Sequence, residues 1–234
     1  MFMPARLVVT SLSFHEAIHI SLNSDSLHGI GIYLSNTPAA VNDATATTAL
    51  YLLLATFRQF TFAEYSLRQQ NWKPRAISSK THDITGKTLA ILGLGGIGLR
   101  FAALAHAFPM HIIYHSRHKK ADAPEYCKYF DDVEEMLRQA DVLSIHVPLR
   151  SETVGLVGKK WIGLLRPGAV IINTARGKII DEEAMVQALE DGHVCTFPMG
   201  LRSTDENSSS SVQWDSTSFR MSQKLIRVCW NSRM

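Results

Sequence analysis

Short apolar runs alternate with longer segments of mixed polarity along much of this chain, from residue 88 to residue 194. Runs of about five apolar residues bounded by turn signals are typical of buried strands. The predicted strands are residues 88–92, 111–115, 142–146 and 169–173. Strands that alternate with helices predict an α/β fold, a doubly wound parallel sheet of the Rossmann type.

The same pattern predicts helices before, between and after these strands. Residues 42–60 are rich in Ala and Leu and apolar on nearly every side, as expected of a buried or interface helix. Residues 62–72 are amphipathic and end before Pro74. Core packing explains both helices without a catalytic role. Further helices are predicted at residues 131–139, 159–165 and 181–190, and a short strand at 30–34 with a turn at 35–38.

A glycine-rich turn joins the strand at residues 88–92 to a helix of small residues. Gly93, Gly95 and Gly98 have the spacing G-x-G-x-x-G. Between a strand and a helix, the first glycine permits the turn, the second admits a pyrophosphate and the third allows close helix–strand packing. The helix N-terminus then faces the phosphates. Glycines also mark ordinary turns, but both flanks fit here, so the sequence predicts a dinucleotide site.

The residues after the second predicted strand bear on the choice of dinucleotide. A selector for NAD would be Asp or Glu about 20 residues after the glycines. This chain has Ser116 and Arg117 there, followed by His118, Lys119 and Lys120. Serine can hydrogen-bond a 2′-phosphate and arginine can pair with it, so NADP(H) is favoured, with NAD(H) possible. A solvated basic loop is the alternative.

The predicted ligand-binding residues follow strands that end at one edge of the sheet. Gly93, Ser116, Val147 and Thr174 each follow a predicted strand. Sheets of this kind bind ligands outside the carboxyl ends of their strands. We therefore expect these residues to border one crevice.

Composition narrows the classes of function. With 46% hydrophobic and 19% charged residues, the chain has the composition of a soluble globular protein. A net charge of +3 with 21 acidic residues does not favour a nucleic-acid partner. The three cysteines and ten histidines show no metal-ligand spacing, so we expect no metal and a reducing compartment. The apolar run 49–55 is too short to span a membrane, and the N-terminal residues make a poor signal peptide; a cytoplasmic location is expected.

Several segments together resemble one enzyme family. They are SNTPAAVNDATATTALYLLLATFR, GLGGIG, YHSR, ADVLSIHVPL, SET and GAVIINTARGKIIDEEAMVQALEDG, within about residues 27–194. In these segments the chain is similar to the D-isomer-specific 2-hydroxyacid dehydrogenases, and most of all to their glyoxylate/hydroxypyruvate reductase branch. GAVIINTARG is more specific to the family than GLGGIG.

The resemblance implies hydride transfer between C4 of a nicotinamide and the α-carbon of a small 2-keto or 2-hydroxy acid. Arg176 matches the family's arginine that binds the carboxylate and keto oxygen of the substrate. A guanidinium suits this role because its planar fork of donors can bind a carboxylate bidentately. The alternative is an arginine that only caps the strand end. The family is commonly homodimeric.

The resemblance also implies a set of cofactor contacts. The glycine-rich turn approaches the pyrophosphate, the residues after the third strand line the adenosine side, and the TARG turn lies near the nicotinamide ribose. The predicted cofactor-binding residues are Gly93, Gly95, Gly96, Ile97, Gly98, Ser116, Arg117, Val147, Pro148, Thr153, Thr174, Ala175 and Arg176. Thr45 matches a threonine that often touches the cofactor, a weaker correspondence.

The chain departs from the family after Val194. Family members continue with a strand, a catalytic glutamate and a later histidine that acts with it as the general acid. Neither the strand motif nor the glutamate motif follows here, and there is no later histidine, because His193 is the last one. Because general acid catalysis contributes about 10²–10⁴ in rate, we expect little or no turnover from this chain.

A shifted reading frame would explain the departure. Read from the third base of the Trp214 codon, the sequence can spell GLDVFPNEP, the missing motif, and Val194-Cys195 is compatible with a splice-donor-like string. The hypothesis is a retained intron over about residues 194–211, which the nucleotide sequence of the transcript would test.

The expected organisation has three parts. Residues 1–36 are a remnant of a substrate domain, residues 37–194 an NAD(P)-binding domain with its leading interdomain helix, and residues 195–234 an aberrant, disordered tail. Without the final strands, we expect Ile171 and Ile172 to lose neighbours and a sheet edge to stay unpaired. Two other interpretations stay open: a non-catalytic, corepressor-like nucleotide sensor, and an unstable fragment.

Overall fold

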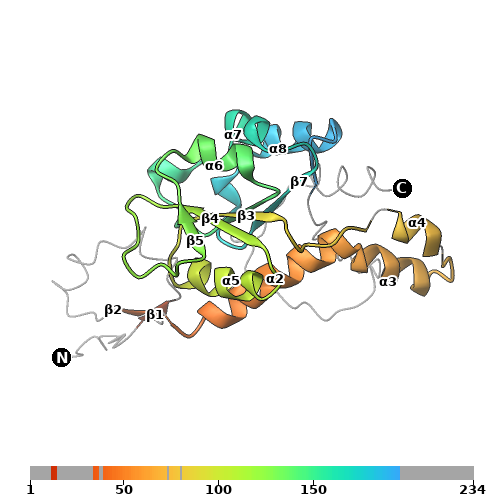
Figure 1. Ribbon diagram of the computed structural model, residues 1–234, viewed down its shortest axis with the longest axis horizontal. Helices are drawn as coiled ribbons and strands as arrows, with labels where there is room; N and C mark the ends of the chain where they lie inside the picture. Colours follow the sequence, from red (N-terminus) through yellow and green to blue (C-terminus); the bar gives the residue numbers. More distant parts are fainter. Residues whose placement is uncertain (1–11, 15–33, 37–38, 73, 80, 196–234) are drawn as a thin grey trace, which may run out of the picture.

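The computed structural model describes residues 12–14, 34–36, 39–72, 74–79 and 81–195. Its centre is a six-stranded parallel sheet with helices on both faces (Figure 1). The strands are β3 (Thr88–Leu92), β4 (His111–His115), β5 (Cys127–Tyr129), β6 (Val142–Ile145), β7 (Ala169–Asn173) and β8 (Val194–Cys195). The predicted α/β fold with a parallel sheet of the Rossmann type is confirmed.

The strand order explains where a ligand can bind. Across the sheet the order is β5-β4-β3-β6-β7-β8, so the chain runs outward from β3 to β5 and then returns to the other side of β3. Leu92 lies opposite His115 of β4 and Ile145 of β6, so the three strands end level with one another. The strand order reverses beside β3, which is where doubly wound sheets bind their ligands.

Side-chain alternation along β3 builds a separate core on each face, because residues two apart in a strand share a face. Leu89 and Ile91 pack on the face covered by α2 (Asn42–Arg58) and α5 (Gly96–His106). Ala90 and Leu92 pack on the face covered by α6, α7 and α8. The helices on this second face are α6 (Val133–Gln139), α7 (Lys159–Leu164) and α8 (Glu182–Glu190).

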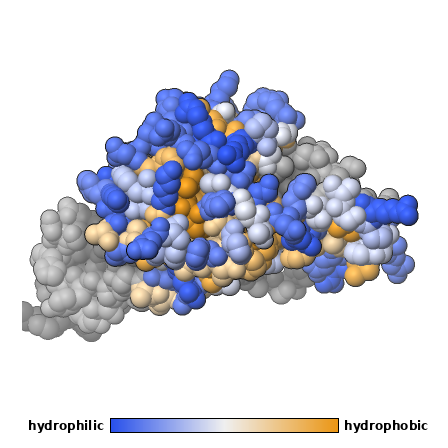
Figure 2. Space-filling view, in the orientation of Figure 1, coloured by the Kyte–Doolittle hydropathy of each residue, from blue (hydrophilic) through white to orange (hydrophobic). Residues whose placement is uncertain are grey.

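The helix α2 packs against both α5 and β7. Its side chains Ala46, Ala49 and Leu53 are 0% exposed. Beyond α2, α3 (Phe60–Arg68) and α4 (Pro74–Ser78) extend away from the sheet as an arm (Figure 1). Figure 2 shows a mostly hydrophilic face, with hydrophobic residues on this arm and along the edge where α2 and α5 lie.

The predicted boundary between the first two helices is wrong. Gln59 has a φ of 54°, and this left-handed residue ends α2 at Arg58, so that α3 begins at Phe60. The second helix ends at Arg68 and not at residue 72, because Gln70 is also left-handed, with a φ of 55°. Apolar periodicity continues across both positions, so the sequence pattern did not reveal the breaks.

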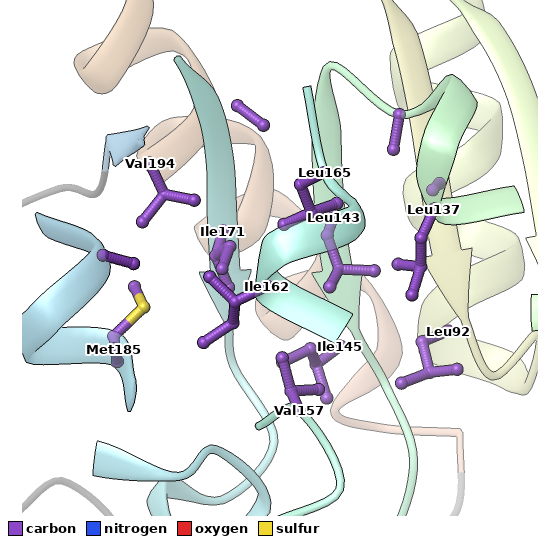
Figure 3. Close-up of a cluster of buried hydrophobic side chains, with 14 of the residues drawn as sticks. Leu92, Leu137, Leu143, Ile145, Val157, Ile162, Leu165, Ile171, Met185 and Val194 are labelled. Atoms are coloured by element: carbon purple, nitrogen blue, oxygen red, sulfur yellow. The ribbon is translucent and has the colours of Figure 1, made fainter. Parts of the chain in front are cut away.

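Figure 3 shows the core on the α6–α7–α8 face. Leu137, Ile162 and Met185 come one from each helix, and they meet Leu143 and Ile171 of the sheet in a single buried cluster. The predicted strands at β3, β4 and β7 have the observed bounds, and β6 ends one residue early. The helices α6 and α8 begin just after their capping aspartates, and α7 ends at Leu164 instead of residue 165.

Two short segments outside the main sheet pair as parallel strands, β1 (Leu12–Phe14) and β2 (Leu34–Asn36). Ser35 and Asn36 therefore belong to a strand and not to the predicted turn, because pairing with a distant segment satisfies their backbone groups. The remainder of that prediction, at residues 30–33 and 37–38, lies outside the described residues, as does the predicted tail beyond residue 195.

The expectation that Ile171 and Ile172 lose their neighbours is wrong. Each is 3% exposed, Ile171 in the core beneath α8 and Ile172 in the core beneath α2. In addition, β8 continues the sheet beside the first two residues of β7. The helices on both faces of the sheet supply the contacts that were expected to come from further strands.

Candidate functional site

Two glycines in the turn between β3 and α5 leave no room for a side chain. Gly93 has a φ of 95°, and a Cβ there would lie 2.9 Å from the carbonyl oxygen of His146. A Cβ on Gly98 would overlap the carbonyl oxygen of Gly93 and lie 3.2 Å from Cγ2 of Ile91. Gly93 therefore permits the turn and Gly98 permits close packing of α5 on β3, as their spacing predicts.

The start of α5 is open on one side and closed on the other. No atom lies within 4 Å of a Cβ built on Gly95, the N-cap residue, whereas a Cβ on Gly96 would overlap the side-chain amide of Asn42 in α2. The first N–H groups of a helix have no partner within it. Together with the helix dipole, they make the open side suitable for an anion such as a pyrophosphate.

Two polar atoms near the predicted site have no hydrogen-bond partner among the described residues. They are Oδ1 of Asn42 and Oγ1 of Thr174, both buried. Buried polar atoms are nearly always hydrogen-bonded, so two unsatisfied ones fit a site that receives a polar ligand. The sequence gives no signal for Asn42, because its contact with Gly96 joins segments far apart in the chain.

The segment after β4 carries the residues predicted to bind a 2′-phosphate. Ser116 is half-buried, and its hydroxyl donates to the carbonyl oxygen of His118 at 2.8 Å. Arg117, Lys119 and Lys120 are exposed. Within the part of the chain that the structure describes, Arg117 has no direct ion-pair partner. Its guanidinium is available to a phosphate.

The segment after β6 forms a compact turn beside the glycines. The hydroxyl of Thr153 donates to the carbonyl oxygen of Pro148 at 2.8 Å and accepts the N–H of Arg150 at 2.7 Å. These bonds hold the 3₁₀ turn η2 (Ser151–Thr153). Val147 lies against Gly93, 2.9 Å from the position of a Cβ. The contact of these residues with an adenosine stays a prediction.

His146, just before this turn in the chain, was not among the site residues predicted from the sequence. His146 Nε2 is 2.8 Å from the hydroxyl of Ser144, and its ring packs at 5.8 Å, centroid to centroid, from that of Phe101. Burial lowers the pKa of His146 to about 4. The imidazole is therefore neutral at pH 7 and stabilises the end of β6.

The turn after β7 orients Arg176. Asn173 accepts the N–H of Ala175 at 3.0 Å and donates to the carbonyl oxygen of Arg176 at 2.8 Å, which fixes the backbone. Within the described residues, the guanidinium of Arg176 donates one bond, from Nη1 to the carbonyl oxygen of Ala175 at 2.8 Å. Partial burial lowers the pKa of Arg176 from its usual value, but arginine stays charged in proteins. Its other N–H donors remain for a ligand.

Apart from Thr45, which lies in α2, the predicted site residues follow the carboxyl ends of β3, β4, β6 and β7, so the fold brings them to one edge of the sheet. The sequence analysis missed Asn42, Ser144, His146 and Asn173. Among the described residues, no three His, Cys, Asp or Glu side chains are grouped to hold a metal, and no helix has the length and apolarity to cross a bilayer.

Comparison with known proteins identifies the family. The model of the D-isomer-specific 2-hydroxyacid dehydrogenase NAD-binding domain matches residues 50–199. This chain belongs to that family. The match covers β3 to β8, including the glycine-rich turn and the turn that carries Arg176. The edge described above is therefore part of an NAD-binding domain of the 2-hydroxyacid dehydrogenase family.

Several known proteins are similar to this chain in sequence and fold. The glyoxylate reductase of Thermococcus gammatolerans is 40% identical over 170 residues, covering 70% of this chain and 51% of the relative. The crystal structure of a glyoxylate reductase from Paecilomyes thermophila superposes with a TM-score of 0.67 at 41% identity, covering 74% of this chain and 52% of that one. An acyclic imino acid reductase in complex with NADPH and D-Arg has a TM-score of 0.70 at 27% identity, with 79% and 59% covered.

The chain spans about half the length of the curated relatives it matches. The shared part is the NAD-binding domain.

Proposed function

We propose that this chain binds a nicotinamide dinucleotide at the carboxyl edge of its sheet, as part of an oxidoreductase of small 2-keto and 2-hydroxy acids. The observation that carries the proposal is the close approach of Gly98 to Gly93 beside the open position Gly95, where the strand order reverses. Membership of the family and similarity to glyoxylate reductases support it. Acids like glyoxylate and hydroxypyruvate are the proposed substrates.

The residues present fit such a cofactor. The backbone N–H groups of Gly95, Gly96 and Ile97 would hold the pyrophosphate at the start of α5, and the turn after β6 would line the adenosine side. Thr174 and Ala175 would face the nicotinamide ribose, where the unsatisfied hydroxyl of Thr174 would find a partner. When bound, the nicotinamide supplies or accepts the hydride.

We assign substrate binding to Arg176. Its backbone is fixed by Asn173 and its guanidinium is half-buried, so the charge lies where solvent screening is reduced. A 2-keto acid presents a carboxylate and a carbonyl oxygen side by side, which matches the forked donors of a guanidinium. Arg176 would hold the acid and polarise the carbonyl that receives the hydride.

The proposed preference is for NADPH over NADH. Arg117, Lys119 and Lys120 give the end of β4 three exposed cations, and no carboxylate occupies the position that would hold two ribose hydroxyls. A 2′-phosphate gains charge-assisted hydrogen bonds there, each worth about 1.5–3 kcal/mol.

Calorimetric titration of the full chain with NADPH and with NADH tests these assignments. We expect NADPH to bind about tenfold more tightly or better, and Arg117→Gln to remove most of that difference. Arg138→Gln, which changes the same charge at the end of α6 on the far edge of the sheet, is the matched control. Equal affinities in the unmodified chain would contradict the NADPH preference, and binding of neither dinucleotide would contradict the site.

We further propose that this chain shows little or no turnover. Among the described residues, no His, Asp or Glu side chain is hydrogen-bonded or ion-paired to Arg176, and the sequence lacks the family's acidic motifs. A general acid is worth about 10²–10⁴ in rate. Steady-state assays with glyoxylate or hydroxypyruvate and NADPH should therefore give rates lower by about this factor than those of complete glyoxylate reductases; a comparable rate would overturn this assignment.

A further inference from the structure

The turn after β6 carries an ion pair that the cofactor assignments above do not use. Nη1 of Arg150 lies 3.8 Å from Oε1 of Glu152, and the hydroxyl of Ser151 donates to Oε2 of Glu152 at 3.1 Å. The backbone of this turn is fixed by Thr153, as described above. The carboxylate of Glu152 is thus held in place although its side chain is 61% exposed.

Strand register brings this turn and the segment that carries Arg117 to the same glycine-rich turn. The N–H of Gly93 donates to the carbonyl oxygen of His115 at 2.9 Å, and the N–H of His146 donates to that of Leu92 at 2.8 Å. The segments after β4 and β6 therefore leave the sheet on either side of Gly93.

The charges of the two segments interact across this turn. The pKa of the Glu152 carboxyl is lowered first by hydrogen bonds from its own backbone and from Ser151, and then by the positive charges of Arg150 and Arg117. Glu152 is therefore paired with Arg150 of its own turn, and the charge of Arg117, in the segment after β4, acts on it at longer range.

We propose that Arg150 and Glu152, together with Arg117, determine the choice of cofactor: Arg150 is a second cationic ligand for the 2′-phosphate, and Glu152 is the counter-charge that the phosphate displaces. This inference rests on the proposed NADPH preference and adds two residues to it. When no phosphate is bound, Glu152 pairs with Arg150 and its charge partly offsets that of Arg117, and so it lowers the affinity for a 2′-phosphorylated adenosine.

Glu152 and Arg150 should have opposite effects on the affinity for a 2′-phosphorylated ligand. Loss of the Glu152 charge removes its repulsion of the 2′-phosphate and its competition for Arg150. The 2′-phosphorylated ligand therefore gains affinity, while the unphosphorylated one gains none. Loss of the Arg150 charge removes attraction, so the 2′-phosphorylated ligand alone loses affinity. Exposed pairs of this kind give effects of about two- to fivefold at low salt, and about 0.5 M salt should reduce them strongly.

The test uses the full chain with two probes, adenosine 2′,5′-bisphosphate and adenosine 5′-monophosphate, titrated by calorimetry. The probes contain only the adenosine half of the cofactor, so the result does not depend on hydride transfer or on a keto acid. The measured quantity is the dissociation constant of adenosine 5′-monophosphate divided by that of adenosine 2′,5′-bisphosphate. A larger ratio means a stronger preference for the bisphosphate. We expect Glu152→Gln to raise the preference for the bisphosphate two- to fivefold and Arg150→Gln to lower it by a similar factor.

Matched controls remove the same charges at the opposite edge of the sheet. Glu190→Gln lies at the end of α8 and Arg138→Gln at the end of α6, and neither should change the ratio. An unchanged or lowered ratio in Glu152→Gln, or an unchanged ratio in Arg150→Gln, overturns the inference while leaving the NADPH preference intact. A ratio near one in the unmodified chain overturns the NADPH preference and the inference with it.

Discussion

At the scale of single residues, the missing side chains of Gly93 and Gly98 decide how closely α5 approaches β3. The carbonyl oxygen of Gly93 occupies the space that a Cβ of Gly98 would need. An added methyl group must therefore push α5 away from the sheet, and the N–H groups at its start would move with it.

The substitution Gly98→Ala tests this account. We expect a loss of about 1–3 kcal/mol in the free energy of unfolding, because the new methyl group overlaps backbone and not a flexible side chain. NADPH affinity should fall as well. Urea denaturation and calorimetry measure the two effects. Gly163→Ala in α7 is the control: no atom lies within 4 Å of its Cβ, so it should be neutral or stabilising by up to about 1 kcal/mol.

A second prediction concerns the partly buried His146. Its pKa is about 4 in the folded protein and about 6.5 when unfolded, so between these values only the unfolded chain binds the proton. The stability contributed by the neutral imidazole is fully present above pH 6.5 and is lost as the pH falls towards 4. The loss amounts to up to about 3 kcal/mol.

Urea denaturation at pH 7 and at pH 4.5 measures this effect in the unmodified chain and in His146→Gln. Glutamine can keep a hydrogen bond to Ser144 but does not titrate. The variant should lose clearly less stability on acidification, since the other histidines titrate in both proteins. An identical loss in both proteins would show that His146 is not the group responsible.

At the scale of elements, α2 is an integral part of the dinucleotide-binding fold. It packs against β7 on one face of the sheet and along α5, and its Asn42 closes the space beside Gly96. An ion pair between Asp43 and Arg100 also links α2 to α5. Because both of its residues are largely exposed, that pair contributes little, and the buried apolar side chains of α2 supply the stability.

Leu53→Ala should therefore destabilise the fold by about 2–5 kcal/mol, because it leaves a cavity at a fully buried position between α2 and the sheet. Val154→Ala, outside the arm of α3 and α4, shortens an apolar side chain at a position that is 58% exposed, and should stay within about 0.5 kcal/mol of the unmodified chain. Chemical denaturation followed by circular dichroism measures both. Similar effects of the two substitutions would mean that α2 is not part of the core.

At the scale of the whole molecule, we propose that residues 37–194 form the NAD(P)-binding domain, with α2 as its leading helix. Large hydrophobic side chains are exposed in the middle of α2, along α3 and just after it. They are Tyr51, Phe60, Tyr65, Leu67 and Trp72, between 44% and 61% exposed. All of them but Tyr51 lie on the arm of α3 and α4, which projects from the sheet (Figures 1 and 2). Exposed apolar groups of this size are typical of interaction surfaces.

We predict that the chain forms the homodimer that is common in its family, through this arm. Light scattering after size-exclusion chromatography should give twice the chain mass of 26.1 kDa. Leu67→Asp should shift the protein to the monomer, because a buried unpaired carboxylate is costly. Val154→Asp is the control, at 58% exposure outside the arm. A monomeric unmodified chain, or a dimer that survives Leu67→Asp, would contradict the assignment.

Local sequence determined the repeating elements and the glycine-rich turn. Apolar runs between turn signals specify β3, β4 and β7 because a strand buried on both faces needs an apolar side chain at nearly every position. The spacing of Gly93, Gly95 and Gly98 predicted the glycine-rich turn between strand and helix, where Gly93 and Gly98 leave no room for a side chain. Parallel strand order then placed Ser116, Val147 and Thr174 at one edge without any knowledge of their contacts.

Only the tertiary structure decided the features that depend on pairs of segments far apart in the chain. The three-residue strand β5 exists because β4 offers it an edge, and Ile171 and Ile172 are buried because α2 and α8 cover them. Asn42 meets Gly96, and the charge of Arg117 acts on Glu152, through the packing of separate elements. Periodicity and spacing describe neighbours along the chain, whereas these contacts arise only when helices and strands pack together, so no local pattern could specify them.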